Sequence, residues 1–252
     1  MPPKDTVNTL ARGTSPLLGA VALVTGGNRG IGRAIALRLA ELGASVAICG
    51  RDAQALAATE AELKKSGSPL HSQLADVSHS ADVTALVDKT QAALGPISIL
   101  VNNAGIGLFG PAHEKSEADW DRVLNTNLKS VFLVSRAVIP AMIQRGAGDI
   151  INISSLAGRN AFAGGGIYCA SKWGLQGLSA CMAEDLREHG IRVSVICPGS
   201  VATGFSTGSS RGPKDPSKVL SPEDVAHAVE MIVTQSPQSF LSEVHVRPLR
   251  KP

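Results

Sequence analysis

An apolar run passes directly into a cluster of glycines at Leu23-Val24-Thr25-Gly26-Gly27-Asn28-Arg29-Gly30-Ile31-Gly32, and a helix-forming pattern follows. Glycines at a strand-to-helix turn let the backbone approach a phosphate group, and the helix N-terminus offers free N–H groups and the positive end of a dipole. The segment is not a P-loop because no Gly-Lys-Ser/Thr follows, and its spacing differs from GxGxxG. By itself it leaves two interpretations open: a phosphate cradle or a tight structural turn.

On both sides of this turn, short apolar runs alternate with segments of helical periodicity. Strands are predicted at 20–25, 45–49, 71–74, 97–102, 149–153, 192–196 and 243–247. Helices are predicted at 31–42, 52–65, 81–94, 117–145, 168–189 and 222–234. Strict alternation of nearly all-apolar strands with helices is typical of a parallel sheet covered on both faces. The sequence therefore predicts the α/β class, with one doubly wound domain and seven parallel strands.

The composition excludes several classes of protein. Hydrophobic residues make up 44% and charged residues 18% of the 252 residues, which excludes intrinsic disorder. The net charge is +3 and aromatic residues make up 3%, which argues against a nucleic-acid partner. Residues 1–17 are expected to form a mobile leader before a domain at 18–252, without the apolar core of a signal peptide. No stretch reaches the roughly 18 apolar residues of a membrane span, so we expect a cytoplasmic protein without a membrane partner.

The cysteines and histidines suggest no special chemistry. Cys49, Cys169, Cys181 and Cys197 lie in apolar stretches without a CxxC pair, so we expect reduced thiols buried in the core. The six histidines are dispersed, and no metal site is predicted. The segment 199–220 is rich in Gly, Ser, Pro and basic residues. An irregular loop of this length in a compact domain is expected to be a substrate lid or disordered.

Seven motifs, in one order and each at its place in the βα pattern, resemble those of the short-chain dehydrogenase/reductase family from about Leu18 to the end of the chain. They are TGxxxGxG at 25–32, Asp76-Val77, Asn102-Asn103-Ala104-Gly105, Asn127, Ser155, the Tyr168-xxx-Lys172 pair, and Pro198-Gly199 with Thr203. The resemblance implies a Rossmann fold, a nicotinamide cofactor and a catalytic set of Asn127, Ser155, Tyr168 and Lys172.

The residue types suit acid–base chemistry on a carbonyl group. Tyr168 is the only tyrosine of the chain, and Lys172 shares its helix face because the two are four residues apart. A phenol titrates near ~10, and a neighbouring ammonium is expected to lower this pKa towards the range of general acid–base catalysis. Ser155 follows a strand and can donate to a substrate carbonyl, while spacing excludes Ser154. The resemblance further implies a helix defect at Asn127, whose amide and a bound water relay protons to Lys172.

The end of the second strand indicates the type of cofactor. In folds that bind NAD an acidic residue there contacts the ribose, but the position holds Gly50, followed by Arg51. Arg51 and Arg29 suit a 2′-phosphate, and Asp52 is interpreted as a helix N-cap, so NADP(H) is expected over NAD(H). The expected cofactor contacts are Gly26, Asn28, Arg29, Gly30, Ile31, Gly32, Arg51, Asp76, Val77, Asn103, Ala104, Gly105, Tyr168, Lys172, Pro198, Gly199, Val201 and Thr203.

Within the family, the chain most resembles 3-oxoacyl-acyl-carrier-protein reductases, through TGGNRGIGRAIA, LVNNAGI and NTNLKSVF. Its basic ending, without the glycines usual there, is more like branches that act on small ketones or 3-hydroxy acids. Both an acyl thioester and a small carbonyl compound therefore stay open as the substrate. An acyl carrier protein also stays open as a partner, and it would contact Arg145, Arg211, Lys214 and Lys218. A catalytically silent NADP-binding sensor is the alternative from another class. The resemblance also implies a homotetramer, formed through 117–145, 168–189 and the last strand.

Overall fold

The structure is a computed structural model that describes residues 15–206 and 215–250. These residues form one parallel sheet with the strands in the order β3-β2-β1-β4-β5-β6-β7. The strands are β1 (Val21–Val24), β2 (Ser45–Gly50), β3 (Leu70–Leu74), β4 (Ile99–Asn102), β5 (Gly148–Ile153), β6 (Ile191–Pro198) and β7 (Glu243–Val246). The predicted doubly wound α/β class is confirmed, and each predicted strand is present with bounds within two residues.

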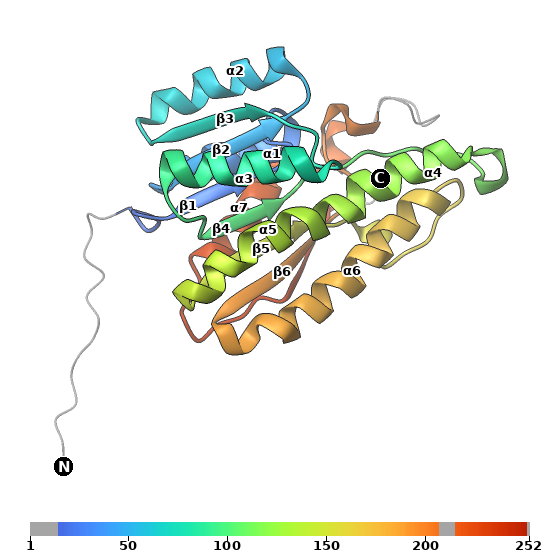
Figure 1. Ribbon diagram of the computed structural model, residues 1–252. Coiled ribbons are helices and arrows are strands. Elements are labelled where there is room, and N and C mark those ends of the chain that lie inside the picture. The colour runs from blue at the N-terminus through green and yellow to red at the C-terminus, as the bar shows by residue number, and fades with distance from the viewer. Residues whose placement is uncertain (1–14, 207–214, 251–252) are drawn as a thin grey trace.

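Helices cover both faces of the sheet (Figure 1). They are α1 (Gly30–Glu41), α2 (Ala53–Leu63), α3 (Ser80–Leu94), α4 (Glu117–Leu124), α5 (Ser130–Arg145), α6 (Gly166–Leu186) and α7 (Pro222–Val233). Side chains of α1, α2 and α7 share one hydrophobic core with the sheet, and those of α3, α5 and α6 share the other. The sequence predicts these helices correctly because each has an apolar face at helical spacing.

The strand β1 shows why the sheet needs a helical layer on each side. Ala22 and Val24 belong to the core beneath α1 and α7, whereas Val21 and Leu23 belong to the core beneath α3 and α5. All four residues are buried, as expected for a strand whose successive side chains point to opposite faces of a covered sheet.

The order of the strands creates a crevice at one edge of the sheet. β1 pairs in parallel with β2 on one side and with β4 on the other, so the chain winds outward in both directions from β1. In open α/β sheets the loops diverge at such a reversal, and ligands bind there, beyond the carboxyl ends of the strands. The glycine cluster follows β1 and therefore opens onto this crevice.

Two expected boundaries need correction. Leu17 was assigned to a mobile leader, but it is buried and its N–H donates to the Leu42 carbonyl at 2.9 Å. The rest of the predicted leader, 1–14, lies outside the described residues. The segment 199–220 is partly regular, because Val201 and Leu220 form a parallel bridge and short 3₁₀ helices occupy Gly204–Ser206 and Pro216–Lys218. Its central part, 207–214, lies outside the described residues.

The cysteine prediction also needs correction at one position. Cys49, Cys169 and Cys197 are buried and unpaired, as expected, but the unpaired thiol of Cys181 is exposed on α6. An apolar stretch within a helix does not fix which residues face the sheet, because α6 also carries apolar residues on its outer side.

The segment Glu117–Arg145 forms one helical run of 29 residues, in which a π-helical turn at Asn125–Lys129 joins α4 to α5. By length and composition this run could cross a membrane, although Lys129, Ser135 and Arg136 interrupt its apolar residues. In the structure 44% of its 18-residue apolar window is buried, with Val134 and Val138 packed in the core beside α3. A long helix that contributes to a protein core satisfies the same length and composition criteria.

Candidate active site

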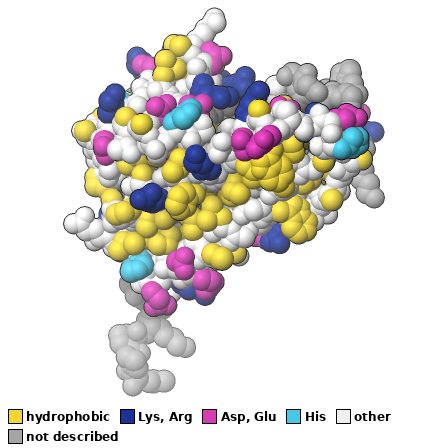
Figure 2. All heavy atoms as spheres, turned by 45° about the vertical axis from the view of Figure 1, so that its right-hand side comes forward, with side chains coloured by type: hydrophobic (Ala, Val, Ile, Leu, Met, Phe, Trp, Pro, Cys, Tyr) yellow, Lys and Arg dark blue, Asp and Glu magenta, His cyan; other side chains and the backbone are white. Residues whose placement is uncertain are grey.

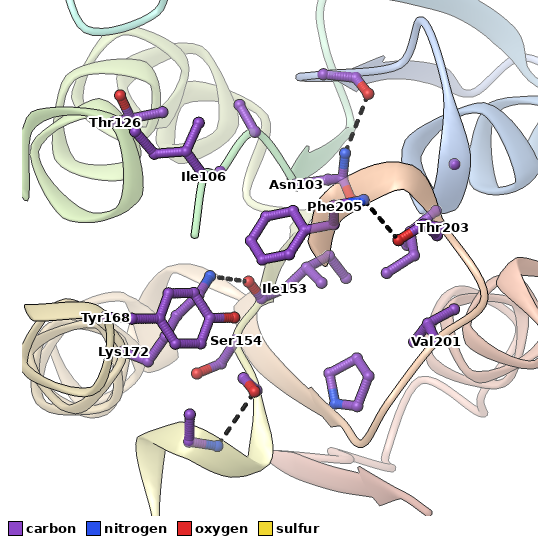
Figure 3. Close-up of a pocket in the computed structure, with 18 of the residues that line it drawn as sticks. Asn103, Ile106, Thr126, Ile153, Ser154, Tyr168, Lys172, Val201, Thr203 and Phe205 are labelled. Carbon is purple, nitrogen blue, oxygen red and sulfur yellow. Dashed lines mark hydrogen bonds between the residues drawn. The ribbon is translucent and has the colours of Figure 1, made fainter. Parts of the chain in front are cut away.

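A cavity of about 1240 Å³ opens at the carboxyl ends of the strands. Loops after β1, β2 and β3 line one part of it, and loops after β4, β5 and β6 line the other together with α6. Figure 3 shows Asn103 and Thr203 from these loops and Tyr168 and Lys172 from α6 around one space. Every residue predicted for the site lines this cavity except Gly32 and Asn127.

The glycine turn after β1 has the geometry of an anion cradle. Gly26 and Gly30 adopt φ values of +63° and +53°, a left-handed conformation that favours glycine. The helix α1 begins at Gly30, and its N-cap residue Arg29 makes no side-chain capping bond. Because the first N–H groups of a helix need an outside partner, this end of α1 can receive a phosphate.

Gly32 supports the cradle from beneath rather than lining it. A Cβ atom on Gly32 would lie 2.2 Å from the Gly26 carbonyl oxygen and 2.4 Å from Nδ2 of Asn103. Only a residue without a side chain lets α1 pack this closely under the turn. We therefore revise the expected cofactor contact at Gly32 to a packing role.

Thr25 and Asn103 tie the ends of β1 and β4 together. The Thr25 hydroxyl accepts from the N–H groups of Asn103 and Ala104 at 3.0 and 3.1 Å. The Asn103 amide in turn donates to the carbonyls of Thr25 and Gly26 at 2.9 and 3.2 Å. These bonds fix the floor of the cavity, and Thr25 was not predicted as a site residue although a hydroxyl at a strand end was visible in the sequence.

Charged groups gather where β2 and β3 end. Nη1 of Arg51 lies 3.3 Å from Oδ2 of Asp76, whose other oxygen accepts two hydrogen bonds from Ser78. Burial raises the pKa of the Asp76 carboxyl, but the bonds from Ser78 and Arg51 outweigh it and leave this pKa below its usual value. Asp52 accepts from the N–H groups of Gln54 and Ala55 at the start of α2, which confirms its interpretation as an N-cap. Arg29 is exposed beside them on the cavity wall.

Tyr168, Lys172 and Ser155 come together in the other part of the cavity. Tyr168 and Lys172 lie one turn apart on α6, and both are buried. The Lys172 amine donates to the Ile153 carbonyl at 2.8 Å and lies 5.9 Å from the centre of the Tyr168 ring (Figure 3). Ser155 follows β5, accepts from the Ala157 N–H at 3.1 Å, and lines the same cavity as Tyr168.

The neighbouring Ser154 has a different environment. Its side chain is 5% exposed, and its hydroxyl accepts from the Gln176 amide at 3.5 Å, on the side of α6. Ser155 is half-buried, and both serines line the cavity. The choice of Ser155, made from spacing, stays a prediction.

The expected electrostatic effect of Lys172 on Tyr168 is not what the structure gives. Burial raises the pKa of Tyr168 to about 12, although the hydrogen bond from Ser155 lowers it. Burial also lowers the pKa of Lys172 to about 8, an effect that Cys197 opposes. Desolvation outweighs the attraction between the two groups because the amine is held on the Ile153 carbonyl, 5.9 Å from the ring centre.

Asn127 lies in the π-helical turn between α4 and α5, so the helix defect expected at this residue is present. Its side chain is fully buried and does not line the cavity. The amide accepts from the Ile106 N–H at 2.8 Å, and donates to the Ile106 carbonyl at 2.9 Å and the Ser171 hydroxyl at 3.1 Å. Asn127 thus fixes the loop after β4, and in these contacts its amide is a positioning group.

Three phenylalanines lie around the phenol, and none of them was predicted as a site residue. The Phe109 ring lies 5.5 Å from that of Tyr168, edge to face, and Phe162 lies 6.0 Å from Phe109. On the other side Phe205, which the sequence analysis did not assign to the site, lies 5.9 Å from Tyr168 (Figure 3). Phe109 and Phe162 are 59 and six residues from Tyr168 in the chain, and no motif connects them.

One cluster of metal-ligand types exists in the described part of the chain. Ligand atoms of Cys197, Glu243 and His245 lie within 4.8 Å of one another. Arg159 already binds both carboxylate oxygens of Glu243, at 3.0 and 2.6 Å, and lowers the pKa of that group to about 2. Burial raises the pKa of the Cys197 thiol to about 11. We interpret the cluster as a charge network that holds β7 to the loop after β5.

Comparison with known proteins identifies the class to which this fold and site belong. Residues 20–214 match the family model for short chain dehydrogenases, and the chain belongs to this family. It is 39% identical over 241 residues to the (3R)-3-hydroxyacyl-CoA dehydrogenase of Canis lupus familiaris, and this match covers 87% of this chain and 91% of that protein. It is 36% identical over 238 residues to the 3-oxoacyl-[acyl-carrier-protein] reductase FabG of Chlamydia muridarum, and this match covers 91% of this chain and 96% of that protein.

Among solved structures, a metagenomic short-chain oxidoreductase in complex with NADP is 46% identical. The match covers 94% of this chain and all of that chain, with a TM-score of 0.82. The chain is therefore an oxidoreductase of a family that acts on CH–OH groups, and the neighbour supports a nucleotide cofactor. The left-handed glycines and the uncapped start of α1 fit the phosphates of such a cofactor.

Proposed function

We propose that the protein is an NADP(H)-dependent reductase that interconverts a carbonyl group and a secondary alcohol, with Tyr168, Ser155 and Lys172 as its catalytic residues. The observation that carries this proposal is the position of Ser155, Lys172 and the buried phenol of Tyr168 on the wall of one cavity that also contains the glycine cradle. These groups lie within one space, as a reaction between a nucleotide and a carbonyl requires.

In the cofactor part of the cavity, Gly26, Asn28 and Gly30 would hold the pyrophosphate, and Asp76 with Val77 would hold the adenine. Asn103, Ala104, Pro198 and Thr203 would surround the nicotinamide. When bound, the reduced nicotinamide supplies a hydride to the carbonyl carbon of the substrate. Arg29 and Arg51 support the phosphorylated form, NADPH, because two guanidinium groups lie on the cavity wall near the end of β2.

The side chains at the phenol have separate tasks. Tyr168 gives its proton to the carbonyl oxygen, and its high pKa keeps this proton in place at neutral pH. Ser155 donates a hydrogen bond to the same oxygen as negative charge develops there. The Lys172 amine donates to the Ile153 carbonyl and holds a proton beside the phenol. From this position the amine can also contact the ribose of the cofactor. Asn127 positions the loop after β4 through Ile106.

For the substrate we propose a 3-oxoacyl thioester or a related small ketone. The FabG relative and the hydroxyacyl-CoA dehydrogenase relative carry names of enzymes for acyl substrates, and they support the first candidate. The basic end of the chain supports an acidic carrier or a charged 3-hydroxy acid, because Arg247 and Arg250 line the cavity.

The experiment that tests this function is the consumption of NADPH against a panel of acetoacetyl thioesters, small 3-keto acids, cyclic ketones and quinones. We expect at least one ketone to be reduced to its alcohol with loss of one NADPH per alcohol formed. A protein that binds NADPH but reduces no member of the panel would support a sensor or scaffold instead.

We further propose that the protein acts in the cytoplasm as a homotetramer. Figure 2 shows hydrophobic side chains gathered over the face of α4, α5 and α6. Trp120, Phe132 and Trp173 are about half exposed there, at 47%, 47% and 51%. A shallow groove between these helices is lined by Leu124, Leu128, Phe132 and Leu178. Exposed apolar surface of this kind is typical of an interface between subunits.

A further inference from the structure

The substrate end of the cavity is enclosed by the chain's few aromatic residues. The sequence contains five phenylalanines and one tyrosine, and four of these six residues, Phe109, Phe162, Tyr168 and Phe205, form one connected series of rings. We refer to Phe109, Phe162 and Phe205 as the phenylalanine wall. They come from three separate segments, which follow β4, β5 and β6, and all three line the cavity.

Backbone contacts fix the phenylalanine wall in place. The Gly110 N–H donates to the Gly164 carbonyl at 2.8 Å, and these two glycines stand one residue after Phe109 and two residues after Phe162. A Cβ on Gly107 would lie 2.8 Å from the Phe109 ring and 2.9 Å from the Phe205 ring, so Gly107 lets these rings approach each other. The wall is therefore held before any substrate binds, which lowers the entropy lost on binding.

The loops after β4 and β5 contribute no charge to this part of the cavity, whereas Lys172 of α6 lines it beside the phenol. Among the described residues that line it between positions 105 and 168, none has a charged side chain, and the polar groups are Thr126, Ser154, Ser155, Asn160 and Tyr168. The Lys115 amine lies close to Gly110, which lines the cavity, but Lys115 itself does not line it. Arg247 and Arg250 line the cavity from the segment after β7, where Pro248 packs on Gly199.

We propose that the phenylalanine wall selects an uncharged ketone that carries an apolar ring near its carbonyl group. The inference rests on the proposed function, since the carbonyl must meet Ser155 and Tyr168. With its oxygen at these hydroxyls, the ring of the substrate packs against Phe109 and Phe162, which prefer edge-to-face or offset contacts with another ring. An anionic substituent packed against the three rings would lose its hydration there. Only a substituent directed away from the phenylalanine wall could meet Arg247 and Arg250.

Three methyl ketones test the proposal because they differ only in the second substituent: 4-phenyl-2-butanone, 2-butanone and acetoacetate. With NADPH present, kcat/KM for 4-phenyl-2-butanone is expected to exceed that for 2-butanone by at least roughly tenfold, from burial of the ring. Acetoacetate is expected to be the poorer substrate of the two small ketones. Equal values for the first two ketones, or a preference for acetoacetate, would overturn the inference while leaving the reductase function in place.

Variants then assign the preference to the phenylalanine wall. Phe109→Ala and Phe162→Ala are each expected to reduce the ratio of kcat/KM between 4-phenyl-2-butanone and 2-butanone by roughly five- to tenfold. Phe240→Ala, a half-buried phenylalanine outside the cavity, is the matched control and should leave the ratio unchanged. The ratio does not depend on the fraction of folded enzyme, so a loss of stability cannot produce the effect. A ratio unchanged in both wall variants would contradict the proposal.

A binding measurement separates the inference from the reductase function. Calorimetry of 4-phenyl-2-butanone with the protein loaded with NADP⁺, a pair that cannot react, reports binding without turnover. Binding that Phe109→Ala weakens and Phe240→Ala does not supports the phenylalanine wall even if no ketone is reduced. Absence of binding, or equal weakening by both variants, would overturn it.

Discussion

The amine of Lys172 is fully enclosed and donates to the carbonyl oxygen of Ile153 at 2.8 Å, where α6 crosses the end of β5. Burial lowers the pKa of this amine from 10.5 to about 8. Between these two values the unfolded chain holds a proton on Lys172 that the folded chain has released. The free energy of unfolding therefore gains a contribution that rises with pH from about 8 to 10.5, and that contribution is absent below pH 8.

As the pH rises through this window, we therefore expect the free energy of unfolding of the parent protein to increase relative to that of Lys172→Met by on the order of 1–3 kcal/mol. The measurement is denaturant unfolding of both proteins at pH 7.5, 9 and 10. The highest pH is limited to 10 because burial raises the pKa of Tyr168 to about 12, and titration of this phenol above pH 10 lowers the free energy of unfolding. A difference between the two proteins that stays constant with pH would contradict the lowered pKa of Lys172.

Replacing the two serines after β5 should have unequal effects. Ser155→Ala removes the donor at the Tyr168 phenol, and turnover is expected to fall by roughly 10²-fold, as when an oxyanion donor is lost. Ser154→Ala removes a buried hydroxyl that accepts from Gln176, so it should change stability more than turnover. The measurement is kcat on a good ketone for both variants with NADPH at saturation. Equal losses of kcat would show that Ser155 has no separate role.

The preference for NADPH should depend on the two arginines near the end of β2. The Arg51 side chain is 56% exposed and forms an ion pair with Asp76. Arg29 makes no side-chain capping bond and lines the cavity. We expect NADPH to be favoured by at least ~10-fold in the parent, and Arg29→Ala to reduce this preference. Arg51→Asp would place a second carboxylate beside Asp76 and should reverse it. Michaelis curves for both cofactors check this, and a parent that prefers NADH would contradict it.

Association of the chain should depend on the face of α4, α5 and α6. Phe132→Asp puts a charge into the groove beside Leu128 and Leu178, and we expect it to dissociate the tetramer at micromolar concentration. Met231→Asp on α7 is the matched control, because Met231 is similarly exposed at 41% but lies on the opposite side of the sheet. Light scattering of the three proteins gives the mass. A monomeric parent protein, or dissociation by Met231→Asp alone, would contradict the assignment.

The sequence predicted those parts of the molecule that depend on local pattern. The apolar runs predicted all seven strands, and the motifs located the residues around the cavity. The residues at 105–109 and 160–165 follow no such pattern, and the bond between Gly110 and Gly164 that brings Phe109 to Phe162 joins segments 54 residues apart. A contact of this kind depends on the tertiary structure, so the phenylalanine wall could not be predicted.

Electrostatic expectations failed where burial mattered. The spacing of Tyr168 and Lys172 correctly put both on one helix face, but it carried no information about their desolvation, which reversed the expected shift of the phenol pKa. Arg51 was expected to suit a 2′-phosphate, and the sequence did not show that it pairs with Asp76, which lies 25 residues away at the end of the next strand. Cys181 was expected inside because its neighbours are apolar, but Met182 and Ala183 pack against the core while the thiol of Cys181 is exposed.

The most direct test of the central claim is the turnover of Tyr168→Phe with NADPH and a ketone that the parent protein reduces. The phenylalanine ring keeps the contacts with Phe109 and Phe205 and removes only the hydroxyl that gives the proton. We expect unchanged folding and NADPH binding, and a kcat lower by roughly 10²–10⁴-fold, which is about 3–5 kcal/mol of the barrier. Turnover near the parental rate would contradict the assignment of Tyr168 as the catalytic acid.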